Sequence, residues 1–393
     1  MALDVAAVQE RLRTVGLDGW LLYDFHGSNP IAARLAGLDG GRHMATRRWY
    51  YLIPAEGQPR GLVHAIERHN LDALPGERFV YAGRQQLEAG LTRLLSGMRR
   101  VAMEYSPMCA IPYLSRVDAG TAEMVRARGI EILSSGDLVQ QFEAAWTPDQ
   151  LASHRAASES LYRIKDRAFQ AASDALRRGT ALDEYQLQQQ MVRWFEEEGL
   201  VSDSPPVVAV GSHAGDPHYL PSAGDCHPIV ANEVLLLDLW GKKPDPGAVF
   251  ADITWVAVTA AQVPGEVSRA FAAIASARDA AVQLVADAAR AGRDLRGWEV
   301  DRAARSVLEH EGYADRIMHR TGHSLGESVH GNGVHMDDYE THDDRRLLPG
   351  TGFTIEPGLY FDSFGVRTEI NVYRGDDEAV VTGPRQATVV TLV

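Results

Sequence analysis

The stretch Val234-Leu235-Leu236-Leu237-Asp238-Leu239-Trp240 is a continuous apolar run that contains a single carboxylate. A run of this kind predicts a strand that is buried on both faces. The stretch Ala251–Val258 repeats the pattern with Asp252 as its acid, and a region rich in lysine, proline and glycine joins the two. We therefore expect an antiparallel hairpin. Because an unpaired carboxylate is costly inside a protein, each aspartate needs an arginine, a hydrogen-bond cage or a metal.

Two glutamates occupy similar positions in the last part of the chain. Glu356 ends an expected strand over 352–356, and Glu369 lies in an alternating strand expected over 366–372. A single buried acid is most often part of a structural ion pair. Four acids on successive strands repel one another unless protons or cations lie between them. Together with a histidine, they favour a pair of divalent metal ions.

Histidines form a second group near these strands. His319, His323 and His330 are spaced by four and seven residues, and the glycines among them favour an extended or turning chain. An extended segment places His319 and His323 on the same side of the chain, and His330 then approaches them from the opposite side. His218 lies 20 residues before Asp238.

The pattern of helices and strands predicts two domains, 1–146 and 147–393. Strands and helices alternate in the first part, which favours an α/β layer. Residues 144–148 form the expected linker, with Thr147 capping a helix that begins at Pro148, and Thr180 with Asp183 suggests a capping box for the next helix. Helices are expected over 5–15, 84–95, 120–129, 148–178, 264–291 and 296–311. Further strands are expected over 19–23, 49–53, 61–64 and 100–103.

Composition narrows the class of protein. The chain of 393 residues is 45% hydrophobic and 23% charged, which is typical of a soluble globular protein. Its formal net charge of −14 disfavours nucleic-acid binding. We see no signal peptide and no apolar run of the roughly 20 residues that a membrane helix needs. With only two cysteines, the sequence fits a reducing cytoplasm.

The order Asp…Asp…His…Glu…Glu resembles the pita-bread metallopeptidases. This family contains Xaa-Pro dipeptidases (prolidases), aminopeptidases P, methionine aminopeptidases and the metal-free creatinases. The resemblance covers roughly 148–393 and is carried by Gly215–Tyr219, Ala251–Thr254, Thr321–Gly326, Thr354–Tyr360 and Val366–Ile370. It implies an α/β (α+β) chain with a pita-bread catalytic domain and a smaller creatinase-like N-terminal domain.

The resemblance also implies a ligand set for two metal ions. Asp238 matches a terminal ligand of one ion, and His323 and Glu356 match terminal ligands of the other. Asp252 and Glu369 match the carboxylates that bridge both. We favour Mn²⁺, with Zn²⁺ or Co²⁺ as alternatives.

Five further residues match the family's active site. His218 and His330 match two histidines near the substrate carbonyl, and His319 matches a third. Tyr360 and Arg367 match a supporting pair, in which Arg367 would hold a bridging carboxylate. Glu356, besides binding metal, would carry a proton to the leaving nitrogen, while His218 and His330 stabilise the oxyanion.

The function favoured by this resemblance is hydrolysis of Xaa-Pro dipeptides by a cytoplasmic homodimer that binds proline-containing peptides. A dipeptidase needs a cation for the substrate's free carboxylate, and Arg345 or Arg346 could supply it, as could Arg47 or Arg48 from a partner subunit. The alternative for each of these arginines is that it lies in a solvated loop and binds no substrate.

Rival functions remain open at this point. An Xaa-Pro aminopeptidase acting on longer peptides is the nearest, followed by a methionine aminopeptidase or an esterase. A metal-free creatinase-like enzyme and a non-catalytic binding module are disfavoured, because all five ligands are retained. Two departures from the family pattern stand out: Gly331–Gly333 follows His330, and the two aspartates are 14 residues apart.

Overall fold

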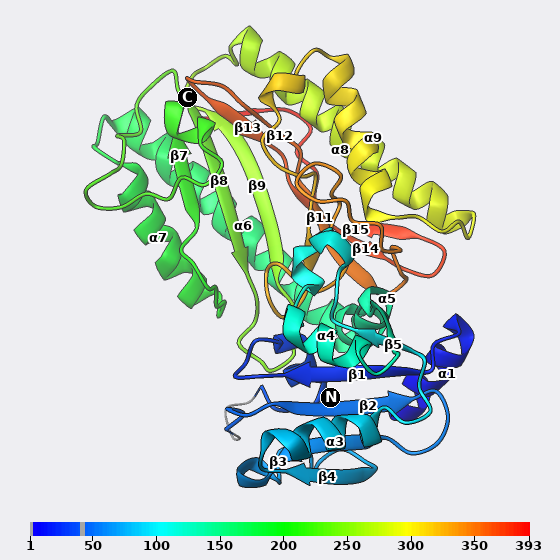
Figure 1. Ribbon diagram of the computed structural model, residues 1–393. Coiled ribbons are helices and arrows are strands. Elements are labelled where there is room, and N and C mark those ends of the chain that lie inside the picture. The colour runs from blue at the N-terminus through cyan, green and yellow to red at the C-terminus, as the bar shows by residue number, and fades with distance from the viewer. Residues whose placement is uncertain (1–2, 40–43) are drawn as a thin grey trace. The chain divides into compact units, whose positions relative to one another are not determined.

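The computed structural model describes residues 3–39 and 44–393 and divides the chain into two compact units. The first unit runs to Glu143 and the second runs from Ala144 to Val393. Figure 1 shows sheets and helices in both. The sequence places the boundary three residues later, after Trp146. That indole belongs with the second unit, because its Nε1 donates to the Leu325 carbonyl at 3.2 Å.

The first unit is a mixed six-stranded sheet in the order β4-β3-β2-β1-β5-β6. Helices α1, α2 and α5 pack on one face and α3 and α4 on the other, so that each face has its own apolar core. The strands are β1 (Gly19–Asp24), β2 (Trp49–Pro54), β3 (Arg60–His64), β4 (Glu77–Tyr81), β5 (Arg100–Met103) and β6 (Glu131–Ser134). The helices are α1 (Val5–Val15), α2 (Pro30–Leu35), α3 (Arg84–Leu94), α4 (Ala119–Arg126) and α5 (Gly136–Val139).

The second unit contains three small sheets, ordered β16-β9-β8-β7, β10-β11-β14-β15 and β12-β13. Its strands are β7 (Val207–Val210), β8 (Val234–Gly241), β9 (Ala251–Val258), β10 (Ser324–Leu325), β11 (Thr351–Ile355), β12 (Gly358–Tyr360), β13 (Gly365–Arg367), β14 (Ile370–Arg374), β15 (Ala379–Val381) and β16 (Val390–Thr391). Its helices are α6 (Pro148–Arg178), α7 (Glu184–Glu197), α8 (Gly265–Arg290) and α9 (Gly297–His310).

Helices cover these sheets from two sides. α6 and α7 pack on the β7-β8-β9 sheet through one apolar cluster, and α8 and α9 contribute to a second cluster with β11, β13 and β14. In Figure 1 the two pairs appear as green and yellow helices flanking the strands. The expected hairpin is confirmed, since β8 pairs antiparallel with β9 along its whole length.

Capping residues explain where α6 and α7 begin. Thr147 caps α6 and Pro148 occupies its first turn, as the sequence predicts. The predicted capping box of Thr180 and Asp183 is wrong. Asp183 is itself the N-cap of α7, and its side chain accepts from the Gln186 amide while Gln186 reaches back to it.

The single alternating strand predicted over 366–372 is also wrong. β13 ends at Arg367 and pairs with β12, whereas β14 begins at Ile370 and pairs with β11. In the gap, the Glu369 amide donates to the carbonyl of Thr254 in β9 at 3.2 Å. The chain therefore passes from one sheet to another at Glu369.

Residues near the C-terminal end of the chain complete the β7-β8-β9 sheet. β16 pairs in parallel with β9, with Val390 beside Ala257 and Thr391 beside Val258. The Leu392 amide donates to the Val258 carbonyl at 3.0 Å. Within 3–39 and 44–393, no helix combines the length and apolarity needed to cross a membrane.

His154 of α6 makes this unit sensitive to acid. It is fully buried, its Nδ1 lies 2.8 Å from the Phe250 carbonyl and its Nε2 lies 2.7 Å from the Thr382 hydroxyl. Burial lowers the pKa of His154 to about 4. Below the ordinary histidine pKa of about 6.5, the unfolded chain binds a proton that the folded chain excludes. Stability is therefore present above that pH and is lost as the pH falls towards 4, by about 3 kcal/mol.

We expect His154→Gln to flatten this dependence. The free energy of unfolding of the second unit, measured by denaturant titration at about pH 7.5 and about pH 4.5, should differ less in the variant than in the wild type. An equal difference in both proteins would show that His154 does not exclude a proton.

Candidate metal centre

The β8–β9 hairpin places two aspartates on one face. Asp238 lies directly opposite Thr254, and Trp240 directly opposite Asp252. Paired residues share a face of a sheet, as do residues two apart along a strand. Both carboxylates therefore project to the same side, and Asp252 is buried at 5% exposure.

Two glutamates reach this side from neighbouring strands. Glu356 follows β11, and its amide donates to the Thr321 carbonyl at 2.7 Å. Glu369, buried at 2% exposure, lies in the gap between β13 and β14. Asn371 joins β14 to β9, because its side-chain oxygen accepts from the Asp252 amide at 3.0 Å. The four predicted acids are thus brought together by strands of different sheets.

His323 completes the group. Its Nε2 lies 3.6 Å from Oδ2 of Asp252 and 3.5 Å from Oε1 of Glu356. Its Nδ1 lies 3.1 Å from the Ser324 carbonyl, so Nδ1 carries the proton and Nε2 presents a lone pair to the carboxylates. Ligand atoms of Asp252, His323 and Glu369 all lie within 4.8 Å of one another. Three lone-pair donors at this spacing suit a shared cation.

The charge balance of the group calls for cations. Oδ1 of Asp252 and Oε1 of Glu369 are buried, and neither has a hydrogen-bond partner among the described residues. Burial first, and then the neighbouring acids, raise the pKa of both carboxyl groups well above the usual range. Divalent cations would bind the orphaned oxygens and neutralise the repulsion. The donor set, four carboxylates and one imidazole, fits two ions of the Mn²⁺ type.

Arg367 is bonded to a different carboxylate from the one expected. Its guanidinium donates from Nη2 to Oδ2 of Asp238, from Nη1 to the Tyr360 hydroxyl at 3.1 Å and from Nε to the Thr254 hydroxyl at 2.9 Å. The expectation that it holds a bridging carboxylate is therefore corrected, because Asp238 matches a terminal ligand. His319 extends this series of hydrogen-bonded side chains, because its Nε2 lies 2.7 Å from the Tyr360 hydroxyl.

Thr254 was not singled out from the sequence. Its hydroxyl lies 2.7 Å from Oε2 of Glu369 and 3.2 Å from Oδ1 of Asp238, between two expected ligands. It stands two residues after Asp252 in a strand, and that alternation alone was a signal that it shares the face. His335, also missed, accepts from the Ser324 amide at 3.1 Å and fixes the backbone beside His323.

Two histidines line the group without contributing to the cluster of ligand atoms. The His330 ring lies edge-on to the His323 ring, with centroids 4.4 Å apart. Packing at this site lowers the pKa of His330, and the neighbouring His323, Arg320 and His218 lower it further. His330 is therefore neutral at pH 7 and retains a ring N–H to donate. His218 is exposed on the segment that follows β7.

Arg345 is not available to recognise a substrate carboxylate. It is buried, and it bonds Asp343 through Nε at 2.9 Å and Nη2 at 2.5 Å, while Nη1 donates to the Asn332 carbonyl at 2.8 Å. These contacts correct the prediction that Arg345 binds the free carboxylate of the substrate. Arg346 lies nearer the surface, 3.8 Å from Oδ2 of Asp294.

Trp240 also lies on the side of the hairpin that carries the two aspartates. Being two residues from Asp238, it shares the metal-facing side, and its Nε1 donates to Oδ1 of the exposed Asp203 at 2.7 Å. Asp203 also contributes to the raised pKa of Asp252, after burial, Asp238 and Glu356. Neither residue was identified from the sequence, since Trp240 reads there only as part of an apolar run.

Comparison with known families matches residues 157–375 to the family model described as metallopeptidase family M24. The chain belongs to metallopeptidase family M24. All five expected metal ligands lie inside the matched segment. The suspected family is thereby confirmed.

Relatives within family M24 include the Xaa-Pro dipeptidase of Lactobacillus delbrueckii subsp. lactis. It is 31% identical over 241 residues, which cover 59% of this chain and 58% of that protein. The probable dipeptidase PepE of Mycobacterium tuberculosis is 31% identical over 175 residues, covering 44% of this chain and 42% of that protein. The chain thus spans about half the length of the curated relatives it matches.

Solved M24 structures share the whole fold. Dipeptidase PepE from Mycobacterium ulcerans superposes with a TM-score of 0.69 at 21% identity, covering 99% of this chain and 96% of that one. The prolidase from Thermococcus sibiricus gives 0.65 at 21% identity, covering 100% and 99%. The X-Pro aminopeptidase from Thermotoga maritima gives 0.59 at 18% identity, covering 98% and 99%. The expected pita-bread fold with an α/β N-terminal part is confirmed.

Proposed function

We propose that the chain is a dinuclear metal-dependent Xaa-Pro dipeptidase. The observation that carries the proposal is the convergence of Asp252, His323 and Glu369 at two buried carboxylate oxygens that lack hydrogen-bond partners among the described residues. Glu356 lies beside His323, and Asp238 and Glu369 both bond the Thr254 hydroxyl. Relatives named as Xaa-Pro dipeptidases support the substrate class. The retained ligands argue against a metal-free creatinase-like enzyme and against a non-catalytic binding module.

The proposed ligands are Asp238, Asp252, His323, Glu356 and Glu369, with Asp252 and Glu369 shared between the ions. Two divalent cations bound here would supply a nucleophilic water at neutral pH and polarise the scissile carbonyl. We propose Mn²⁺ because four of the five side chains are oxygen donors.

The protein's own groups would handle the proton and the developing charge. Glu356 keeps some exposure, with 14% of its side chain accessible, and would pass a proton from the attacking water to the proline nitrogen. Neutral His330 would donate its ring N–H to the carbonyl oxygen as that oxygen becomes negative, and His218 would assist. The bonded series His319, Tyr360 and Arg367 would keep Asp238 in position.

Substrate length separates the two nearest functions. A proline nitrogen carries no hydrogen once acylated, so an Xaa-Pro bond suits a site that does not require that donor. A dipeptidase also recognises the free carboxylate that follows, whereas an aminopeptidase accepts further residues. Because Arg345 is bonded to Asp343, another group must perform this recognition if the protein is a dipeptidase.

We expect Ala-Pro to be hydrolysed with Mn²⁺ at least about 100-fold faster than Ala-Pro-amide or Ala-Pro-Ala, since a site built around a charged contact rejects substrates that lack or displace it. Initial rates from released alanine would measure this. Similar rates for the dipeptide and the tripeptide would identify an Xaa-Pro aminopeptidase and leave the metal centre unchanged.

Assembly and location belong to the same proposal. We propose a homodimer that acts in the cytoplasm on proline-containing peptides, with no role for nucleic acid or membrane. The net charge of −14 supports the exclusion of nucleic acid. Analytical ultracentrifugation of the purified chain would test the dimer.

A further inference from the structure

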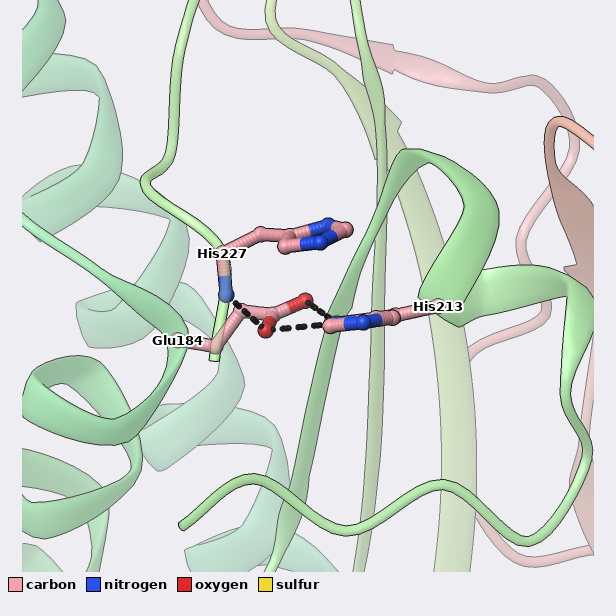
Figure 2. Close-up of side chains that lie close together, drawn as sticks. All are labelled: Glu184, His213 and His227. Carbon is pink, nitrogen blue, oxygen red and sulfur yellow. Dashed lines mark hydrogen bonds and ion pairs between the residues drawn. The ribbon is translucent and has the colours of Figure 1, made fainter. Parts of the chain in front are cut away.

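Glu184, the first residue of α7, accepts hydrogen bonds from four groups although it is fully buried. The donors are the Val210 amide at 2.6 Å, the His227 amide at 2.6 Å, the Tyr219 hydroxyl at 2.5 Å and Nδ1 of His213 at 2.9 Å. Figure 2 shows the carboxylate between His213 and the backbone of His227. Burial and Glu184 together raise the pKa of Tyr219, so its hydroxyl stays protonated and donates.

The arrangement is that of an anchor and not of a metal site, although ligand atoms of Glu184, His213 and His227 lie within 4.8 Å of one another. The rings of His213 and His227 are stacked, with centroids 3.6 Å apart and planes 13° apart. Their nitrogen lone pairs lie in nearly parallel planes, so one cation cannot meet both head-on. Both oxygens of the carboxylate are already occupied by donors.

His218 lies on the segment that this carboxylate holds. His213 and Tyr219, on either side of it, both bond Glu184, and the His227 amide bonds the same group further along. Tyr219 is buried, whereas its neighbour His218 is exposed. The His218 amide donates to Oδ1 of Asp216 at 3.0 Å, which tightens the turn between the anchors.

The same segment packs closely against the β12-β13 hairpin, which carries Tyr360. A Cβ added at Gly215 would lie 2.3 Å from the Phe361 carbonyl, and one added at Gly365 would lie 1.9 Å from the Ala214 carbonyl. Backbone therefore meets backbone at this point, and side chains larger than hydrogen do not fit. The Glu184 contacts and this close approach together leave the segment little freedom to move.

We propose that Glu184 is a positioning residue for His218. One buried carboxylate holds the residues on both sides of His218 and so fixes the direction in which its imidazole projects towards the substrate carbonyl. The inference rests on the proposed function, in which His218 assists at that carbonyl.

The first test is Glu184→Gln in the full chain loaded with Mn²⁺. The amide nitrogen of glutamine would face donors that now share the carboxylate, so at least one anchor is lost. We expect kcat for Ala-Pro to fall at least about 10-fold while KM changes less than about 3-fold, because His218 acts on the transition state. Metal content should stay at the wild-type value.

A double-mutant cycle separates positioning from general stabilisation. If Glu184 acts through His218, Glu184→Gln should cost less than about 2-fold when introduced into His218→Ala. If Glu184 only stabilises the fold, the two losses should multiply, and the proposal is overturned. Glu198→Gln is the matched control, because Glu198 follows the same helix but bonds Arg163, and its kcat should equal that of the wild type.

Tyr219→Phe keeps the test decisive if Glu184→Gln does not fold. It removes one of the four donors and keeps the ring that stacks on His213, with centroids 4.0 Å apart. We expect a smaller loss of kcat that is again absent in the His218→Ala background, and a fully active Tyr219→Phe would contradict the proposal. A wild-type protein that hydrolyses no Xaa-Pro peptide would instead refute the proposed function before any variant is compared.

Discussion

Glu369→Ala should lose both metal ions and reduce hydrolysis of Ala-Pro by more than about 100-fold, the upper range for residues that merely support a ligand. Glu369 is buried, one of its oxygens lacks a hydrogen-bond partner among the described residues, and its other oxygen is bonded by Thr254. Alanine cannot span two cations, and no other described acid lies in the gap between β13 and β14. Asp252→Ala should behave in the same way.

Metal analysis of the dialysed variants by mass spectrometry, alongside steady-state kinetics, would measure this loss. A variant that retains two ions per chain and full activity would refute the ligand assignment. Thermal stability provides a control for misfolding. Because Asp252 raises the pKa of Glu369, and Asp238 and Glu356 raise that of Asp252, removing one carboxylate relieves repulsion in the metal-free protein. The metal-free variant should melt no lower than the metal-free wild type.

His330→Ala should lower kcat by about 100-fold with both ions still bound, a loss in the range measured for a single oxyanion donor. The ring of His330 packs on that of His323, but the cluster of ligand atoms is formed by other side chains. KM for Ala-Pro should change little, because the hydrogen bond strengthens only as the oxygen gains charge.

His342→Ala is the matched control for this experiment. His342 is an exposed histidine that stacks on Trp298 and bonds Asp338, and its replacement should leave kcat unchanged. If metal content falls in His330→Ala as far as activity does, His330 is itself a ligand and the assignment must change.

The sequence predicts the elements that carry the candidate centre better than the contacts between them. α1, α6 and β9 match their expected bounds because apolar spacing and caps are local signals. The sequence does not reveal β4 and β6, since short strands with exposed residues lack such a pattern, nor β7, which is a buried run of only four residues. The four acids were identifiable because a carboxylate inside an apolar strand conflicts with the local pattern.

The hydrogen-bond and ion-pair partners of individual side chains could not be predicted from the sequence. Arg345 follows two aspartates, and only the folded loop shows that Asp343 accepts from Nε and Nη2 of its guanidinium while the Asn332 carbonyl accepts from Nη1. Arg367 lies 129 residues from Asp238 along the chain, so nothing local distinguishes that partner from Asp252 or Glu369. Glu184 begins an ordinary amphipathic helix, and the four donors that converge on it come from segments up to 43 residues away.

The parallel pairing of β16 with β9 has a consequence for synthesis on the ribosome. β9 carries Asp252, and part of its outer edge stays unpaired until Val390 and Thr391 have been made and have left the exit tunnel. The first unit, complete at Glu143, can close its sheet long before then. A stalled or prematurely terminated chain would therefore expose the strand edge at Ala257 and Val258, where it could pair with another nascent chain.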